Sequence, residues 1–378
     1  MKKILLLALA LVMLLGCAVP AVGETIINPD DKSVTYPVRT PANKGNNPVI
    51  EGEHPFTGLK AETDEERDAL EHYTPIALVF DNNAEGYMHM GIGSADVIFQ
   101  IPNQSTSNNK QLAVFASHFP VYAGGSRSAR MTAFPLALAM DAAFVSAGFG
   151  PPAGMESGVV DFDAYRRKYK YNLDLKWFDL TSGRKYHHRA EELGAEKVWS
   201  NVGHIQDIRN DYLIAKDVQF EKRPFLFTDE PLTRGEIANV IDMKFYENSE
   251  GRGGTNENSD CTFRYEDGVG YTRDILKGTE FDRTTQEFLY FANVIVLRTP
   301  VRGHGVSGTD YKYFENHLVG SGKADIFQNG RYIRGAWYRE KENSRLIFLD
   351  DEGNELKFQR GKSYIVVNNS NCVVTYDE

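Results

Sequence analysis

The sequence predicts an α+β fold, with an N-terminal mixed α/β domain over residues 75–225 and a mostly β C-terminal domain over residues 236–377. Three observations lead to this prediction. Apolar strand-like runs alternate with helix-like segments in the first region, which is typical of a mixed α/β domain. Short strand-like runs recur in the second region with turn signals between them, which indicates a β-rich domain. The chain has 378 residues, enough for two domains at about 100–200 residues each.

The composition is that of a globular protein with an acidic balance. Hydrophobic residues make up 42% of the chain, charged residues make up 25%, and the formal net charge is −10. A protein that binds the phosphate backbone of a nucleic acid needs a basic surface, so the sequence predicts no nucleic-acid partner. The chain has no CxxC motif and no close cluster of Cys and His residues, so it predicts no metal site and no cofactor.

The N-terminus has the pattern of an export signal with a lipidation site. Two lysines follow Met1, and the apolar run from Ile4 to Leu15 is shorter than the ~20 residues of a membrane-spanning helix. A glycine precedes Cys17 directly after this run, which is typical of a lipoprotein signal peptide over residues 1–17 with Cys17 as the lipidated residue. The alternative is an ordinary secretory signal that is cleaved before Glu24.

Both interpretations predict an exported protein. Lipidation of Cys17 would anchor it to the outer face of the cytoplasmic membrane, so that the membrane surface is a partner. Residues 18–74 are rich in Pro and Asn and show little apolar periodicity, so we expect a flexible tether there. A short helix is expected to begin within it at Thr63–Arg67.

Compact apolar runs predict the buried strands of the N-terminal domain. Strands are expected over residues 75–81, 97–101, 112–116 and 143–148, and helices over residues 132–140, 162–169, 187–193 and 204–213. Thr132 is expected to cap the first of these helices, because Pro135 is tolerated only in a first turn. The polar run Asn103–Lys110 is expected to be a loop or hairpin connection between two strands.

The C-terminal domain shows shorter strand-like runs separated by turn signals. Strands are expected over residues 240–245, 262–265, 294–299, 324–327, 332–338, 346–349, 364–368 and 373–376. Asn329-Gly330 predicts a type I′ hairpin turn, since both central residues of that turn need a positive φ. Asp350–Asn354 predicts a further turn, and the glycine-rich stretch over residues 250–260 predicts a mobile loop.

Two cysteines remain outside the signal segment. In an exported chain Cys261 and Cys372 can form one disulfide, and the alternative is two separate buried thiols. The sequence leaves both interpretations open.

The loop over residues 124–130 is the candidate ligand-binding site. Its two glycines give the backbone freedom, Ser126 and Ser128 carry hydroxyl donors, and Arg127 and Arg130 carry guanidinium groups. A helix follows directly, and a helix N-terminus combined with arginines favours anions such as phosphate or carboxylate. The alternative is structural, with one arginine paired to a buried carboxylate and the other exposed to solvent.

Two carboxylates stand at strand ends in the same domain. Asp81 ends one predicted strand and Asp96 precedes the next, and residues at such positions often line the ligand crevice of an α/β sheet. They are candidates for holding Mg²⁺ or pairing with the arginines, and the structural alternative is a turn or cap residue. His187 and His188 form the densest histidine site and are expected at the exposed start of a helix, where neighbouring side chains point in different directions.

The combination of these motifs resembles a known family. Gly93–Phe99 is similar to its "G..ADIVYE" segment and Gly124–Arg130 to its "GPxRSAR" motif. The C-terminal matches are Tyr271, Arg273, Gly278, Asp282 and Asn293–Val296, which resemble "YxR…G…D…NVIV", and Gly335–Trp337, Asp351–Gly353 and Gly361 in the final hairpins. On these segments, over about residues 76–376, the chain resembles the YerB-like lipoproteins of Gram-positive bacteria, built from N- and C-terminal DUF3048 domains.

The chain also departs from that family pattern. Gln100 stands where the family has Glu, Asn103–Lys110 replaces its "EGGITR" stretch, and its "PHN" signature has no clear counterpart near His187. The resemblance implies an architecture and no established reaction. If the departing positions form a polar site with the loop over residues 124–130, they imply an altered or lost activity in this member.

The sequence is compatible with two functions that use the loop over residues 124–130, and also with a purely structural or assembly role, which a broad exposed apolar patch would indicate. The first is an envelope protein that is not an enzyme and that binds an anionic cell-wall ligand or an envelope protein through Arg127 and Arg130. The alternative is an enzyme acting on lipid-linked or cell-wall polymer phosphates, with the arginines clamping phosphate and Asp81 or Asp96 holding Mg²⁺. The arginine-bearing loop is also similar in arrangement to that of the LytR-CpsA-Psr phosphotransferases, which is a likeness of fold only.

Overall fold

The computed structural model describes most of the chain from residue 40 onward. The described residues are 25–27, 35–37, 40–82, 89–103, 108–149, 167, 175–182, 185–190, 201–246, 257–305, 312–369 and 371–377. The predicted signal peptide with Cys17, the helix over 162–169 apart from Arg167, and most of the glycine-rich loop lie outside them. No helix among the described residues is long and apolar enough to cross a membrane.

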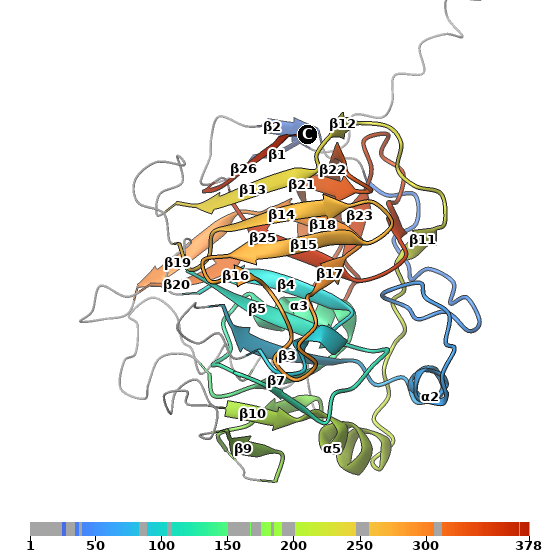
Figure 1. The fold of residues 1–378 in the computed structure, drawn as a ribbon, viewed down its shortest axis with the longest axis vertical. Helices are drawn as coiled ribbons and strands as arrows, with labels where there is room; N and C mark the ends of the chain where they lie inside the picture. Colours follow the sequence, from blue (N-terminus) through green and yellow to red (C-terminus); the bar gives the residue numbers. More distant parts are fainter. Residues whose placement is uncertain are drawn as a thin grey trace, which may run out of the picture.

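One sheet of eleven strands runs through both predicted domains (Figure 1). Its strand order is β12-β22-β21-β18-β25-β4-β5-β3-β7-β8, with β23 paired to β22. The two halves join where β25 (Ser363–Asn368) pairs in parallel with β4 (Val97–Pro102), with Ser363 opposite Val97. The predicted α+β class is therefore confirmed, and the halves share one sheet instead of forming separate ones.

The N-terminal part of this sheet consists of strands that are buried on both faces, apart from the edge strand β8 (Trp177–Asp179), which is partly exposed. Its other members are β3 (Ile76–Asp81), β5 (Asn109–Phe115), β7 (Ala143–Ser146) and β8 (Trp177–Asp179). Near-continuous apolar runs are typical of such strands, which explains why the sequence identified β3, β4 and β7. Helix α3 (Ala133–Met140) packs against this part with all eight of its residues buried.

The C-terminal part of the sheet is mostly antiparallel. It contains β12 (Glu236–Ile237), β18 (Asn293–Arg298), β21 (Gly320–Gln328), β22 (Arg331–Arg339) and β23 (Ile347–Leu349). The predicted hairpin turn between β21 and β22 is confirmed, because Asn329 and Gly330 have φ angles of 52° and 66°.

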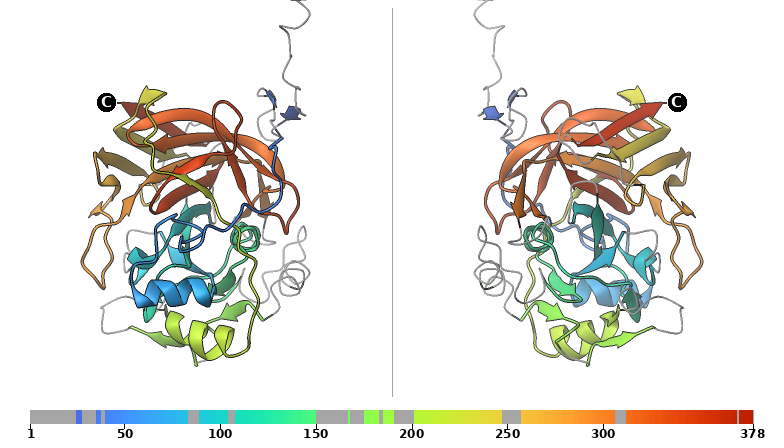
Figure 2. Two further views of the ribbon diagram at one scale, coloured as in Figure 1. Left: turned by 90° about the vertical axis from the view of Figure 1, so that its right-hand side faces the viewer. Right: turned by 90° about the vertical axis from the view of Figure 1, so that its left-hand side faces the viewer.

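A second sheet covers the face of the central sheet that is opposite to α3. It consists of β13 (Val240–Phe245), β14 (Cys261–Glu266), β15 (Gly270–Ile275), β16 (Gly278–Thr279), β17 (Tyr290–Phe291) and β26 (Cys372–Asp377). Its apolar face, including Phe263 and Tyr271, forms one hydrophobic cluster with Phe80 of β3 and Tyr364 of β25. Figure 2 shows the β-rich half above the α/β half in two side views.

Short elements complete the fold. They are β1 (Thr25–Ile27), β2 (Thr35–Pro37), α2 (Asp64–Glu71), a 3₁₀ turn (Ile92–Ser94), β6 (Tyr122–Gly124), β9 (His187–Arg189), β10 (Asn201–His204), α5 (Ile205–Asp207), a π-helical turn (Ile208–Ile214), β11 (Leu226–Thr228), β19 (Val301–Gly305), β20 (Lys312–Asn316) and β24 (Lys357–Gln359). The helix expected over 187–193 is wrong at its start, where β9 pairs with β10 in a three-stranded sheet with β6. The helix expected over 204–213 is confirmed, although its second part is π-helical.

The flexible tether expected over residues 18–74 is wrong for residues 40–74. From residue 40 onward the chain packs on the body: Phe56 is fully buried and contacts the ring of Phe225, and Asn47 donates to the carbonyl of Pro224. The helix expected near Thr63 is confirmed as α2, which Thr63 and Glu66 close with a reciprocal capping box.

Cys261 and Cys372 are free, buried thiols, so the disulfide interpretation is wrong for this structure. The reason is the order of the strands. Cys261 lies opposite Met243 of β13 and Cys372 opposite Phe245, so β13 runs between the two cysteines. Two inter-strand spacings of about 4.8 Å exceed the ~7 Å limit between the Cα atoms of a disulfide.

Candidate functional site

The ends of β3 and β5 bring a carboxylate and a lysine together. Asp81 and Lys110 are directly opposed in this antiparallel pair, so their side chains leave the same face of the sheet. Asp81 is 3% exposed and Lys110 is 1% exposed. The Lys110 Nζ lies 3.9 Å from Asp81 Oδ1.

The predicted ligand-binding loop inserts beside the same strand end. Ser126 forms a bridge with Phe80, the Arg127 amide donates to the carbonyl of Val79 at 3.0 Å, and the Ala147 amide donates to the carbonyl of Arg127 at 3.1 Å. The loop therefore runs between β3 and the end of β7. Because side chains alternate along a strand, Arg127 falls on the face that carries Asp81.

Arg127, Asp81 and Lys110 form one charged cluster. The Arg127 Nε lies 2.9 Å from Asp81 Oδ2, so the carboxylate stands between two cations. The Arg127 side chain is 22% exposed, whereas the other two are buried. Burial lowers the pKa of Lys110 to about 7; Asp81 opposes this shift, and the guanidinium groups of Arg130 and Arg127 add to it. The site thus combines an accessible guanidinium with an amine that titrates near neutral pH.

The other predicted loop residues hold the loop in place. Arg130 is 7% exposed and donates to Asn103 Oδ1, to the carbonyl of Ala129 at 2.9 Å and to that of Ser128 at 3.3 Å. The Ser128 hydroxyl donates to the carbonyl of Ala147 at 3.1 Å, and Ser126 is fully buried. These contacts match the structural interpretation of the second arginine, except that Arg130 is buried and not solvated.

The helix N-terminus expected to attract an anion is closed. Thr132 is fully buried and makes no capping bond, because its hydroxyl donates to Asn316 Oδ1 at 2.8 Å and accepts from the Asn316 amide at 3.0 Å. The predicted Thr132 cap is therefore wrong. The first helical residue, Ala133, is also fully buried. A ligand at Arg127 would have no contact with this helix end.

Asp96 does not belong to the cluster. Its Oδ2 accepts from the amides of Ala116 and Ser117 at 2.7 and 2.8 Å, and its Oδ1 accepts from the Ser117 hydroxyl. Burial raises the pKa of Asp96, and these bonds oppose that shift. Asp96 lies beside the Phe115 end of β5, and Asp81 lies at the Lys110 end. At about 3.4 Å per residue, the two carboxylates are roughly 17 Å apart along the strands.

A second polar network lies on the opposite face of the same strand ends. Gln100 of β4 opposes Gln111 of β5, and the Tyr364 hydroxyl donates to Gln100 Oε1 at 2.7 Å. Arg273 of β15 enters from the second sheet, donating to Glu280 Oε2 at 2.9 Å and to Gln100 Oε1 at 3.3 Å. All five side chains are fully buried. Gln100, which departs from the family pattern, and Arg273, which matches it, are thus in contact.

His89 connects the two faces. Its Nε2 lies 2.5 Å from the carbonyl oxygen of Asp81, and its Nδ1 lies 3.2 Å from Glu280 Oε1. Burial would raise the pKa of Glu280, but the charge of Arg273 and hydrogen bonds from His89 and Gln111 hold it at about 2. The described residues place several buried polar atoms without a hydrogen-bond partner around these strand ends: Asn82 Nδ2, Asn109 Nδ2 and Oδ1, Gln111 Oε1, Ser126 Oγ and Arg273 Nε.

The described part of the chain contains no group of three or more His, Cys, Asp or Glu side chains placed to hold a metal ion. The cluster at Arg127 offers one carboxylate, which is already shared between two cations. The cluster is therefore suited to contact an anion through the paired N–H donors of the Arg127 guanidinium, beside the Lys110 amine, which can exchange a proton.

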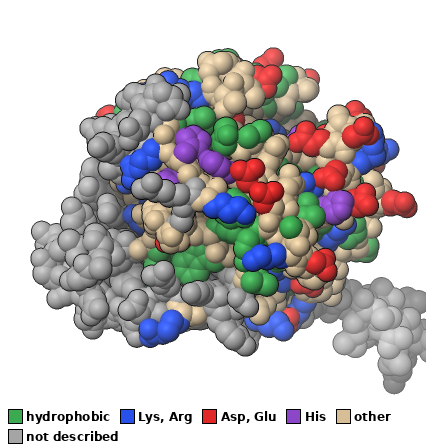
Figure 3. All heavy atoms as spheres, turned by 90° about the horizontal axis from the view of Figure 1, so that it is seen from below, with side chains coloured by type: hydrophobic (Ala, Val, Ile, Leu, Met, Phe, Trp, Pro, Cys, Tyr) green, Lys and Arg blue, Asp and Glu red, His purple; other side chains and the backbone are tan. Residues whose placement is uncertain are grey.

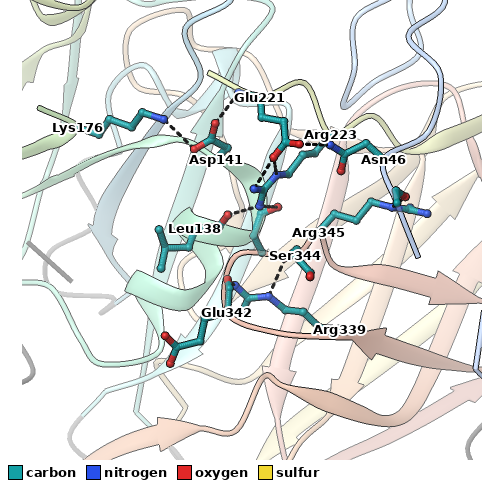
Figure 4. A network of polar contacts seen from close by, with 12 residues as sticks. Asn46, Leu138, Asp141, Lys176, Glu221, Arg223, Arg339, Glu342, Ser344 and Arg345 are labelled. Atoms are coloured by element: carbon teal, nitrogen blue, oxygen red, sulfur yellow. Dashed lines mark hydrogen bonds and ion pairs between the residues drawn. The ribbon is translucent and has the colours of Figure 1, made fainter. Parts of the chain in front are cut away.

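A polar cavity of about 620 Å³ lies elsewhere, where the N-terminal segment reaches the body (Figure 4). Its arginines are engaged in structural contacts. Arg223 donates to Glu221 Oε2 at 2.7 Å and to the carbonyl of Leu138 at 2.6 Å. Arg345 donates to the carbonyl of Asn43 and to Glu355. These contacts fix the segment around residues 43–47 against the body of the protein, so the cavity is not assigned as the ligand site.

The sequence indicates Arg127 and Asp81 but not Lys110. The run Asn109-Lys110-Gln111 is polar and has the pattern of a loop, although it forms the buried start of β5. Glu280 and His89 are also missed, because neither stands in a recognisable motif. The sequence does carry one signal, which is Arg273. A buried arginine needs a carboxylate partner, and Glu280 faces Arg273 across the next turn of the chain.

Comparisons with known proteins agree with this architecture. The N-terminal DUF3048 domain of unknown function matches residues 56–189, and the C-terminal DUF3048 domain matches residues 254–365. The crystal structure of YerB from Bacillus subtilis superimposes with a TM-score of 0.65 over 85% of this chain and 99% of that one, at 20% sequence identity. No curated protein matches the chain. Both matched domains stand in the expected order, and the chain belongs to the DUF3048 family.

Proposed function

We propose that this protein is an exported, lipid-anchored envelope protein that binds an anionic group at Arg127. The observation that carries the proposal is the Arg127–Asp81 contact, in which a 22% exposed guanidinium is oriented by a 5% exposed carboxylate side chain. Guanidinium groups bind phosphate and carboxylate groups through paired N–H donors, and a partly exposed guanidinium held by a carboxylate is oriented for such a contact. The partner is an anionic cell-wall ligand or an acidic segment of an envelope protein.

Lys110 supports the same proposal. An anion that approaches Arg127 also approaches the buried amine, and a nearby negative charge favours the protonated form of a lysine. Because the pKa of Lys110 is about 7, we expect anion binding to take up protons and to strengthen as the pH falls from 8 to 6.

A thermal-shift experiment tests the binding site. The probes are inorganic pyrophosphate and a polyprenyl phosphate in detergent micelles, applied to the wild type, Arg127→Ala, Arg127→Lys and Arg264→Ala. We expect stabilisation that is lost in Arg127→Ala and weakened in Arg127→Lys, which keeps the charge but loses the fork. Arg264→Ala is the control, because Arg264 is an exposed arginine paired with Asp274 on the second sheet. An equal response of all four proteins would refute the site.

The anchoring part of the proposal has its own test. Labelling of cells with a palmitate analogue is expected to mark the wild type at the membrane and to leave Cys17→Ala unlabelled. A labelled Cys17→Ala protein would refute lipidation at this residue, without bearing on the anion site.

The alternative, an enzyme acting on lipid-linked or wall-polymer phosphates, receives less support. Arg127 and Asp81 are in contact, as it requires, but Asp96 lies at the far end of the strands and Arg130 is bound to its own loop. Turnover of the polyprenyl phosphate in the binding assay, absent in Arg127→Ala, would favour this alternative.

A further inference from the structure

One of the two adjacent histidines that stand out in the sequence, His188, meets a third histidine across a sheet. In the sheet of β6, β10 and β9, His188 opposes Val202, and His204 opposes Tyr122. His188 and His204 are therefore diagonal neighbours on one face, within reach of each other. His187 opposes Gly203 and points to the other face, where it contacts Asn201. This sheet lies at the end of the molecule viewed in Figure 3, where histidine side chains reach the surface.

The two facing imidazoles are aligned nitrogen to nitrogen. His188 Nδ1 lies 2.8 Å from His204 Nε2. The Tyr122 ring packs edge-on against both imidazoles, with centroids 5.0 and 4.9 Å away, which limits their rotation. The far nitrogen of His204, Nδ1, lies 3.3 Å from Asp207 Oδ2. A carboxylate at this distance favours the form of His204 that carries its proton on Nδ1, which leaves Nε2 as the electron-pair donor that faces His188.

We propose that His188 and His204 form a two-histidine site for a late first-row divalent metal ion, with Asp207 orienting His204 and water completing the coordination. Imidazole is a preferred ligand of Cu²⁺, Ni²⁺ and Zn²⁺. A metal-bound histidine usually has a carboxylate beside its other ring nitrogen, and Asp207 stands at that place beside His204. Binding requires His188 to carry its proton on Nε2, which is a change of tautomer in a neutral ring.

The spacing of the two nitrogens favours one geometry. With metal–nitrogen bonds of about 2.0–2.1 Å, two ligands at right angles lie about 2.9 Å apart, and two tetrahedral ligands lie about 3.3 Å apart. The observed 2.8 Å is close to the first value. Cu²⁺, which takes square arrangements and heads the affinity order of these metals, should therefore bind more tightly than Zn²⁺.

Titration calorimetry of the untagged protein with CuCl₂, NiCl₂ and ZnCl₂ at pH 7.5 tests the site. We expect one Cu²⁺ per chain, bound more tightly than Zn²⁺, and an electron paramagnetic resonance spectrum with coupling to two imidazole nitrogens. His188→Ala and His204→Ala should each weaken Cu²⁺ binding at least tenfold. Asp207→Asn should weaken it by about tenfold, as loss of such an orienting carboxylate does elsewhere.

His187→Ala is the matched control, because it removes the neighbouring imidazole on the opposite face of the same strand. His188→Gln, which retains hydrogen-bonding capacity, serves as the second variant if His188→Ala unfolds. The proposal is overturned if wild type binds no Cu²⁺, if His187→Ala weakens binding as much as His188→Ala, or if His188→Gln retains full affinity. In each of these cases the two rings are a hydrogen-bonded pair and no more.

Discussion

Replacing Arg273 tests whether the buried network holds the two halves together. Arg273 donates from Nη1 to Glu280 and from Nη2 to Asn82 and Gln100, at 2.9, 3.1 and 3.3 Å. The variant Arg273→Met places an unbranched apolar side chain in the same space and removes these three hydrogen bonds. It also leaves the Glu280 carboxylate fully buried without its cation.

The size of the effect follows from that burial. Removing one partner of a buried ion pair costs about 3–5 kcal/mol, a large share of the ~5–15 kcal/mol that stabilises a folded domain.

The pH dependence of the stability should also change sign. In the wild type the pKa of Glu280 is about 2, so its contribution is present above the ordinary glutamate pKa and is lost as the pH falls toward 2. Without Arg273, burial dominates and raises the pKa of Glu280, so we expect the variant to recover stability relative to wild type as the pH falls.

Urea unfolding followed by tryptophan fluorescence, at pH 7 and pH 4.5, measures both effects. Arg264→Met is the control, because Arg264 lies on the adjacent strand β14 with a 57% exposed side chain, 2.8 Å from Asp274. An exposed pair of this kind contributes less than about 1 kcal/mol. The reasoning is refuted if Arg273→Met costs no more than Arg264→Met, or if its destabilisation is as large at pH 4.5 as at pH 7.

Two further predictions concern the opposite end of the strands. Asp96→Ala leaves the buried amides of Ala116 and Ser117 without their acceptor, so we expect a loss of about 2–4 kcal/mol in urea unfolding and unchanged pyrophosphate binding; lost binding in a folded variant would return Asp96 to the site. His54 is 2% exposed and neither of its ring nitrogens has a hydrogen-bond partner among the described residues. Burial lowers its pKa although Asp96 and Glu66 act in the opposite direction, so stability is full above about pH 6.5, the unfolded value, and falls below it. Between pH 7 and pH 5 the melting temperature of His54→Phe should therefore fall less than that of the wild type. The melting temperature of His72→Phe, which changes an exposed histidine, should fall as much as that of the wild type.

The strands that the sequence predicts well are those whose burial is encoded locally. Ile76–Phe80 and Val294–Leu297 are continuous apolar runs because both faces of the central sheet are covered. The start of β5 has the pattern of a loop because Asn109, Lys110 and Gln111 are polar. The burial of Asn109 and Gln111 depends on distant partners: the Asn109 amide donates to Ser259, and the Gln111 side chain donates to Glu280 and Tyr364.

The wrong predictions have the same physical origin. Residues 40–74 contain the prolines and polar residues of a linker, but Phe56 finds Phe225 nearly half the chain away. His187–Arg189 carries no apolar alternation, and it is a strand only because β10 pairs with it. For the candidate site, the Asp81–Arg127 contact is among the expected alternatives. The separation of Asp96 from it depends on strand register, which local sequence does not encode.

The position of β25 in the central sheet also governs the order in which the chain can fold. This strand follows both β4 and β18 in the chain and supplies the neighbour of each. Until it arrives, each half exposes an unpaired apolar strand edge, which is a template for aggregation. Contacts between such distant residues form slowly, since a long loop must close first. A chain interrupted before Ser363 would thus lack the join between its halves and would leave the facing edges of β4 and β18 unpaired.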